Sequence, residues 1–260
     1  AWKIPYWDLE FWDMIESTLI SKIYRGIWHF TEVAVKEIDI ALDTPVLQQQ
    51  FQNYVENWYS LRHPHIIPLL GASQTHNIPY VVMPYLSKGN LVQYLENDLD
   101  IPHLISIILD ISSGMQYLHS RQLIHGELMA SNILIDNYGE PSICDLGFSK
   151  YFYFTTPTTT TINRYIRWTA NEIQDNYVCT FASDVYSFGM LCYEIFSGGD
   201  VPFSDIPEKI IPEAVKSGKR PNRPPYCPDE IWELMQECWH INPDRRPSFY
   251  EISQRLMQIK

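Results

Sequence analysis

The stretch LIHGELMASNILI at residues 123–135, followed by CDLG at residues 144–147, decides the fold. In the first piece a histidine precedes Glu127 and Asn132 in a polar loop between two short β-rich runs, and Asp145 follows a further predicted strand. Phosphoryl-transfer enzymes use such an arrangement to hold a base and two metal ligands around one phosphate. The stretch therefore predicts a phosphate-directed site built around this loop.

These motifs resemble the catalytic loop and the metal-binding turn of the protein kinases, which read H-R-D-L-x-x-x-N and D-F-G. Here they read H-G-E-L-x-x-x-N and D-L-G, so Asn132 and Asp145 match the metal ligands, and Glu127 stands at the position of the catalytic base. The resemblance implies an α+β, bilobal kinase-like fold. Its small N-lobe is rich in β-strands and holds one helix (αC), and its larger C-lobe is mostly helical.

Further motifs at the expected separations extend the resemblance over residues 16–260. The motifs LRHPHII, MPYLSKGNL and CWHINPDRRPSF are most similar to the tyrosine-kinase-like group. The resemblance implies an N-lobe at 16–83, a hinge at 84–88 and a C-lobe at 89–260, preceded by an extension at 1–15. In this extension Trp7, Phe11, Trp12 and Ile15 have a spacing that predicts an amphipathic helix over residues 2–16.

The composition argues against several other classes of protein. The 260 residues include 19 Lys and Arg against 31 Asp and Glu, a formal net charge of −12, which argues against a nucleic-acid surface. The five cysteines lack the spacing of a zinc site or a disulfide framework. No apolar run is long enough to span a membrane, and the first residues lack the features of a secretory signal. We therefore expect an intracellular protein or a soluble domain of a longer one.

Periodicity predicts the main elements of both lobes. Strands are expected at 17–28, 32–38, 69–72 and 80–83, and helices at 48–61 and 102–120. The sequence VAVK at 33–36 looks like the kinase strand whose lysine, here Lys36, holds the α- and β-phosphates.

Two features of the N-lobe depart from the kinase pattern. The three positions of the glycine-rich phosphate loop fall on Glu16, Thr18 and Ser21, so a carboxylate and added β-carbons would keep a triphosphate away. The glutamate that pairs with the strand lysine falls on Tyr54, and Glu56, two residues along the helix, should face elsewhere. We expect Lys36 to have lost its usual partner, or to be held by Asp145.

The positions that surround adenine in kinases carry residues of suitable type. With Lys36 they form the predicted cofactor-binding set: Ile23, Ala34, Met83, Leu86 and Leu134. Met83 falls at the gatekeeper position. The alternative is that these residues are ordinary members of the core.

The C-lobe motifs imply structural roles. Asp184 is expected to brace the backbone of the catalytic loop, and Arg246 to form an ion pair with Glu172. The threonine-rich residues 155–161 occupy the place of an activation segment. They are interpreted either as phosphate acceptors or as a solvated loop of low complexity.

Three functions remain open at this point. The first is a catalytically impaired kinase-like domain, a pseudokinase, that acts as a scaffold or allosteric partner of another protein, such as an active kinase or signalling complex. The second is a slow, atypical Ser/Thr or dual-specificity kinase that uses Glu127 as base with ATP and Mg²⁺. The third is a nucleotide-sensing switch without phosphotransfer. The first requires no cofactor, and Asn132 and Asp145 become metal ligands only if nucleotide and Mg²⁺ bind.

Overall fold

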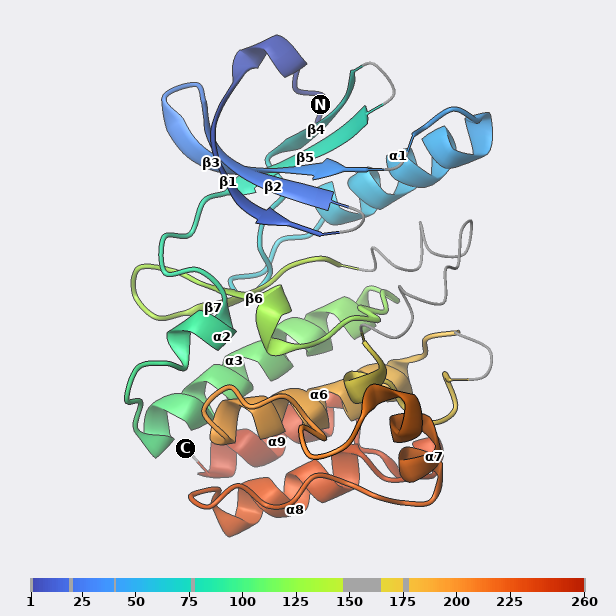
Figure 1. Ribbon diagram of the computed structural model, residues 1–260. Helices are drawn as coiled ribbons and strands as arrows, with labels where there is room; N and C mark the ends of the chain where they lie inside the picture. Colours follow the sequence, from blue (N-terminus) through green and yellow to red (C-terminus); the bar gives the residue numbers. More distant parts are fainter. Residues whose placement is uncertain are drawn as a thin grey trace. The chain divides into compact units, whose positions relative to one another are not determined.

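The computed structural model describes residues 2–18, 21–39, 41–75, 78–146, 165–174 and 178–259. The chain forms two compact units, Ala1–Ser87 and Lys88–Lys260 (Figure 1). In the described part of the chain, the first unit holds a five-stranded sheet and one α-helix, and the second is mostly helical with one short hairpin. The predicted α+β class is confirmed.

An antiparallel sheet in the order β1-β2-β3-β5-β4 forms the centre of the first unit. The strands are β1 (Leu9–Ser17), β2 (Ser21–Trp28), β3 (Thr31–Ile38), β4 (Gly71–Thr75) and β5 (Ile78–Pro84). A two-residue turn joins β2 to β3, and its residues His29 and Phe30 both have positive φ, at 45° and 64°. This is the backbone shape that matches the twist of paired strands. The predicted hairpin is therefore confirmed, although β2 begins later than expected.

The predicted helix over residues 2–16 is wrong. A short 3-10 helix, η1 (Tyr6–Asp8), is followed by β1, whose backbone pairs with β2. The aromatic stripe does not mark a buried helix face, because Trp7 is 80% exposed and Trp12 47% exposed. Pairing with an existing strand satisfies the backbone groups of this segment, and that long-range gain outweighs the local pattern.

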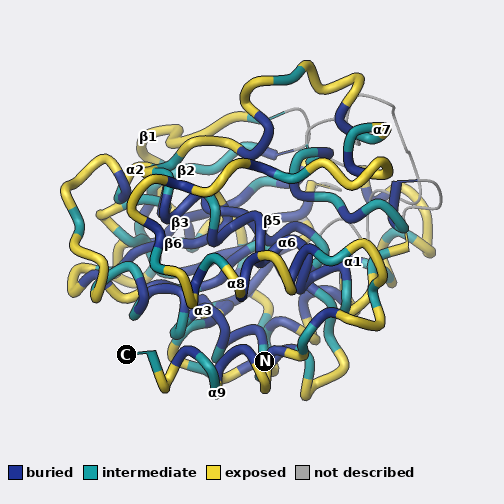
Figure 2. The backbone as a smooth tube through the Cα atoms, turned by 90° about the horizontal axis from the view of Figure 1, so that it is seen from below, coloured by how far each residue is buried: buried dark blue, intermediate teal, exposed yellow. Residues whose placement is uncertain are grey.

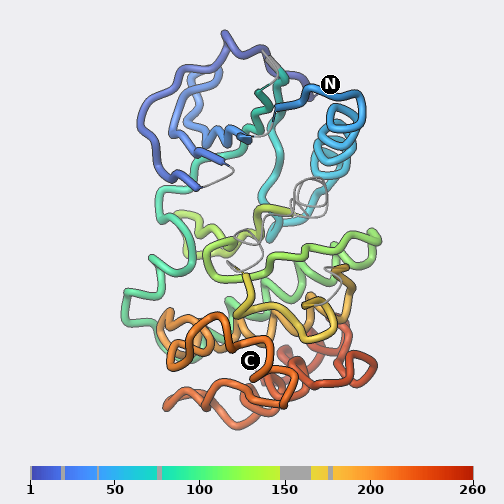
Figure 3. The backbone as a smooth tube through the Cα atoms, turned by 45° about the vertical axis from the view of Figure 1, so that its right-hand side comes forward, coloured from blue at the N-terminus to red at the C-terminus, as the bar shows by residue number. Residues whose placement is uncertain are grey.

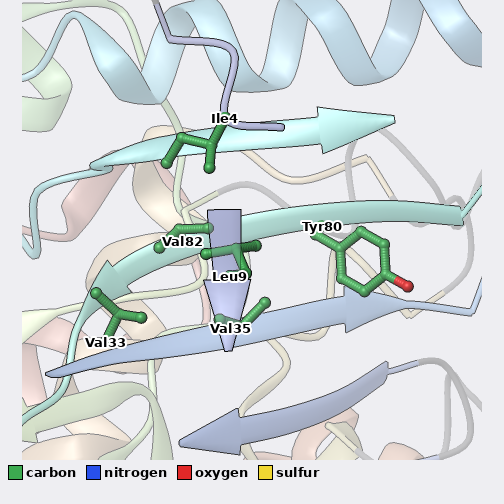
Figure 4. Close-up of a cluster of buried hydrophobic side chains, with 6 residues drawn as sticks. All are labelled: Ile4, Leu9, Val33, Val35, Tyr80 and Val82. Atoms are coloured by element: carbon green, nitrogen blue, oxygen red, sulfur yellow. The ribbon is translucent and has the colours of Figure 1, made fainter. Parts of the chain in front are cut away.

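The N-terminal residues cover one face of the sheet. The Ile4 N–H donates to the carbonyl of Ala72 on the β4 edge, and the Ala72 N–H donates to the Trp2 carbonyl. Strand β1 then lies at the opposite edge. Between the two edges Ile4 and Leu9 pack on a buried cluster (Figure 4) that also contains the following residues: Val33, Val35, Tyr80 and Val82. Residues 2–9 thus form a strap across the sheet.

The helix of the first unit, α1 (Pro45–Tyr59), starts three residues before its predicted start. Thr44 caps it by accepting a hydrogen bond from the Leu47 N–H, and a proline occupies its first turn. Its buried stripe is Phe51, Tyr54, Val55 and Trp58, as the 3.6-residue period predicts. The Trp58 indole also donates to the Ile67 carbonyl at 2.8 Å.

The second unit is built around two long helices, α3 (Ile101–Ser120) and α6 (Phe181–Phe196). The other α-helices among the described residues are α2 (Leu91–Tyr94), α7 (Ile211–Lys216), α8 (Asp229–Cys238) and α9 (Phe249–Ile259). Helix α3 packs on α9 and α6, and α6 packs on α8 (Figures 1 and 3). Helix α6 is buried over most of its length (Figure 2).

Short elements complete the second unit. The hairpin consists of β6 (Ile133–Ile135) and β7 (Pro141–Ile143). The 3-10 helices are η2 (Ala130–Asn132), η4 (Ile166–Trp168), η5 (Glu208–Ile210) and η6 (Pro243–Arg245). The loop predicted as the functional centre runs into η2 and then into this hairpin. The threonine-rich residues 155–161 lie outside the described residues.

Candidate active site

A buried histidine organises the loop before β6. The His125 Nε2 lies 2.9 Å from the Cys144 carbonyl oxygen, and its Nδ1 lies 3.1 Å from the Glu127 N–H. Because a carbonyl accepts and an N–H donates, Nε2 carries the proton and Nδ1 accepts, which is the neutral tautomer. Burial lowers the pKa of His125, in agreement with this assignment. The side chain ties the loop to the residue before Asp145.

Asp184 on α6 holds the same loop by its backbone. Its carboxylate accepts from the His125 N–H at 2.9 Å and the Gly126 N–H at 2.8 Å, and it contacts the His119 Nε2 at 2.9 Å. The residue has no exposed surface. Gly126 has φ +81°, which a glycine adopts without strain. The predicted brace is confirmed.

The candidate base and metal ligands of the second unit are held by backbone contacts. Asn132 Nδ2 donates to the Glu127 carbonyl at 2.7 Å, and the Cys144 N–H donates to the Asn132 carbonyl at 3.0 Å. Glu127 and Asn132 are both buried. Asp145 is half-buried and has φ +59°, an uncommon conformation for a residue other than glycine. These contacts hold Glu127 and Asn132 together and fix the residue before Asp145.

Glu194 is a further residue of this region that the sequence analysis missed. It lies on α6, is 2% exposed, and its Oε2 accepts from the Ala130 N–H at 3.0 Å and the Trp168 Nε1 at 2.8 Å. Glu194 therefore joins the catalytic loop to η4. An acid inside the apolar run MLCYEIF was the signal that could have found it.

Burial raises the pKa of Glu194 from its ordinary value of 4.5 to about 7. The folded state therefore binds a proton that the unfolded chain releases above about pH 4.5, so this group's contribution to stability falls as the pH rises through this window. Through this group, the free energy of unfolding of the unchanged protein should fall by about 3 kcal/mol between pH 4.5 and 7. We expect Glu194→Gln to lack this fall, because the glutamine side chain stays neutral. Urea unfolding across this pH range measures the difference from the unchanged protein. Parallel pH profiles of the two proteins would contradict the assignment.

In the first unit, Lys36 shares one face of the sheet with apolar residues. Side chains alternate along a strand, so Ala34 and Lys36 lie on the same face of β3, and paired residues on neighbouring strands share that face. Ile23 pairs with Lys36, and Met83 pairs with Ala34. Lys36 is 4% exposed. Four residues of the predicted cofactor-binding set thus stand together, on the face opposite to the strap.

The other two members of that set lie elsewhere. Leu86 is half-buried in the segment after β5, and Leu134 is half-buried in β6. Leu134 belongs to the second unit, with Glu127, Asn132 and Asp145. The structure therefore places the predicted site residues in two groups, one in each unit.

The turn between β1 and β2 is closed by its own hydroxyl groups. The Thr18 N–H donates to the Ser21 carbonyl at 2.8 Å, and the Ser21 N–H donates to the Thr18 Oγ1 at 3.1 Å. The two hydroxyl oxygens lie 3.0 Å apart. Glu16, at the first glycine position, is exposed. Both N–H groups are used inside the turn and are not directed to a bound anion.

The position of the missing ion-pair glutamate is filled by a buried aromatic residue. Tyr54 is 1% exposed and stacks against Trp58 with ring centroids 5.8 Å apart. Glu56 is exposed and accepts from the Gln52 amide at 2.7 Å. The expectation that Glu56 faces away from the core is confirmed.

An ion pair in the second unit also matches its prediction. Arg246 donates from Nη1 and Nη2 to the two carboxylate oxygens of Glu172, at 2.5 and 2.9 Å. The same guanidinium donates to the Ala182 and His240 carbonyls, each at 2.9 Å. The Arg246 side chain has no exposed surface. It joins the segment after η4 to the segment before α9.

Comparison with known proteins identifies the family of the chain. Residues 9–256 match the family described as protein tyrosine and serine/threonine kinase. The chain belongs to the protein kinases. The match starts at β1, so it includes the strand that the sequence pattern had predicted as a helix. It also supports the relationship to tyrosine kinases.

Similar proteins include kinases of both named specificities. The kinase domain is 32% identical to the probable serine/threonine-protein kinase kinX of Dictyostelium discoideum, over 100% of this chain and 24% of that protein. It is 32% identical to the megakaryocyte-associated tyrosine-protein kinase of Rattus norvegicus, over 98% of this chain and 54% of that protein. It is 34% identical to tyrosine-protein kinase csk-1 of Caenorhabditis elegans, over 77% and 38%. The chain thus spans about a quarter to about half the length of these relatives. Among the described residues, no helix has both the length and the apolar character needed to cross a membrane.

Proposed function

We propose that this kinase domain is catalytically impaired and works inside the cell as a scaffold or allosteric partner of another protein, such as an active kinase or a signalling complex. The observation that carries the proposal is the β1–β2 turn, in which Thr18 and Ser21 bond to each other. The N–H groups of Thr18 and Ser21 are used internally, and Glu16 beside the turn adds a charge that repels phosphate. These residues do not fit the phosphate groups of ATP, and no transfer step follows from them.

Phosphotransfer tests this proposal directly. With γ-labelled ATP and Mg²⁺, we expect the unchanged protein to label itself or a protein acceptor no faster than Glu127→Ala does. The reason is that rate enhancement in kinases comes mostly from positioning and charge neutralisation, which the altered turn weakens. The Asp145→Ala variant controls for a contaminating kinase, because contaminating activity is unchanged by either substitution. Transfer that is abolished in both variants would overturn the proposal.

A slow kinase is the second candidate, because the loop that holds Glu127 is intact. Asp184 braces its backbone, Asn132 bonds to the Glu127 carbonyl, and the relatives are named as kinases. In this case Glu127 serves as the base, with Lys36 and Asp145 on the phosphates and the metal ion. The extra methylene of glutamate displaces the carboxylate by about 1 Å relative to aspartate, and such a displacement can lower the rate about a hundredfold.

Nucleotide binding without transfer is a separate possibility that the apolar face around Lys36 favours. Ile23, Ala34 and Met83 offer a surface for a flat base. Titration with ATP and with adenosine, each with and without Mg²⁺, tests it by thermal unfolding. A ligand present at a hundred times its Kd should add about 2.7 kcal/mol of stability. We expect adenosine to stabilise the domain as much as ATP does, since the phosphates gain no contacts at the turn. Stabilisation by ATP and Mg²⁺ alone would contradict that expectation.

A further inference from the structure

The second unit carries a surface pocket of about 310 Å³ that belongs to none of the groups above. It lies between the segment after α7, one face of α8 and the segment after α8. Its lining includes Arg220, Pro221, Trp232, Gln236, Trp239 and Ile241. This volume is at the lower end of the range found for small-molecule sites. It therefore suits a ligand of one or two rings.

The walls of the pocket are aromatic. The indole rings of Trp232 and Trp239 meet edge to face, with centroids 5.6 Å apart and an interplanar angle of 77°. Trp239 is buried and fixed at the end of α8, whereas Trp232 is half-buried. Such rings present flat apolar surfaces that favour another flat ring.

Arg220 provides a positive charge at this pocket. Its Nε donates to the Trp239 carbonyl at 2.8 Å, and its Nη1 donates to the Lys219 and Val215 carbonyls at 2.8 and 3.2 Å. A guanidinium group has five N–H donors. Within the described residues, Nη2 makes no hydrogen bond and the group forms no ion pair. Two N–H groups of a half-buried cation are therefore left for a ligand.

The surroundings of Arg220 compensate this charge only in part. The guanidinium groups of Arg220 and Arg246 both lie over the Tyr186 ring, at 5.4 and 5.2 Å from its centroid. Arg246 is paired with Glu172. One carboxylate thus faces two cations, and burial lowers the pKa of Arg220. A partly buried cation that shares its counter-charge with a second cation is unfavourable, and a bound anion would lower that cost.

We infer that this pocket binds a small aromatic carboxylate, with its ring against Trp232 and Trp239 and its carboxylate on Nη2 of Arg220. The aromatic walls suit the ring of this ligand, and the unpaired N–H groups suit its carboxylate. A charge-assisted hydrogen bond from a guanidinium N–H to a carboxylate is shorter and stronger than a bond between neutral groups. The site is independent of the catalytic loop and of the proposed function.

Calorimetric titration with indole-3-acetate and with neutral indole-3-acetamide tests the inference, because the two probes differ mainly in charge. For a ligand of this size we expect a Kd on the order of 1 mM for the acetate. The acetamide should bind at least tenfold more weakly. Equal affinity for both probes, or no binding of the acetate at 10 mM, would overturn the inference.

Variants place the binding in this pocket. We expect Arg220→Gln and Trp232→Ala to weaken the binding of indole-3-acetate at least tenfold, whereas Lys219→Gln should change its Kd by no more than twofold. Lys219 carries the same charge next to Arg220 and does not line the pocket. If Arg220→Gln does not fold, the decision rests on Trp232→Ala and on indole N–H chemical shifts. Indole-3-acetate must then change the indole N–H chemical shifts of Trp232 and Trp239 in the unchanged protein. Unchanged shifts would show that the ligand binds elsewhere.

Discussion

Replacing Arg246 with methionine is expected to lower the free energy of unfolding by about 3 to 5 kcal/mol. The substitution removes both bonds to Glu172 and the donors to the Ala182 and His240 carbonyls. It leaves the carboxylate and two carbonyl groups without their partner in a largely buried place. Urea unfolding followed by tryptophan fluorescence measures the change.

Arg245 offers a matched control for this experiment. It is the preceding residue, carries the same charge and is exposed, so Arg245→Met should change the stability by no more than about 0.5 kcal/mol. The double variant Glu172→Gln with Arg246→Met should lose less than the sum of the two single variants, since the residues share one interaction. Additive losses would show that the ion pair does not hold these segments together.

Asp184→Asn is expected to cost about 3 kcal/mol or more, although the side chain keeps its shape. The buried carboxylate accepts from two backbone N–H groups and from His119. An amide can accept with one oxygen only, and its NH₂ group would face a donor. The backbone amides of His125 and Gly126 should also exchange with solvent hydrogen faster than in the unchanged protein.

Asp98 serves as the control because it is exposed and its side chain forms no hydrogen bond or ion pair within the described residues. Asp98→Asn should leave both the unfolding midpoint and the exchange rates unchanged. If Asp184→Asn lowers stability but leaves exchange at residues 125 and 126 as slow as before, then Asp184 supports α6 rather than the loop.

The catalytic loop could be predicted because its residues stand at fixed offsets and each has one partner type. Asp184 braces the backbone of the loop, and Glu172 pairs with Arg246, as expected. Helix α3 could be predicted equally well, since its apolar residues repeat at the helical period. The helix follows from local periodicity, and the two long-range contacts could be expected only because the motifs resemble those of a known family.

Other features depend on contacts that no local pattern encodes. The spacing of Trp7, Phe11 and Trp12 fits a helix, but pairing with β2 makes the segment a strand. Glu194 lies in an apolar run, and its two partners are 64 and 26 residues away in sequence. The hydroxyl contact between Thr18 and Ser21 follows from their position in a turn whose glycines are missing. The residues at the glycine positions could be read from the sequence, but the hydrogen bonds between Thr18 and Ser21 could not.

The strap has a consequence for handling the protein. Residues 2–9 cover the cluster around Val35 and shield the outer edge of β4. A version trimmed to begin at Glu16 would lose β1 as well, exposing apolar surface together with unpaired strand edges on both sides of the sheet. Such edges recruit strands from neighbouring molecules, so trimmed protein should precipitate or form fibres where the longer chain stays dispersed.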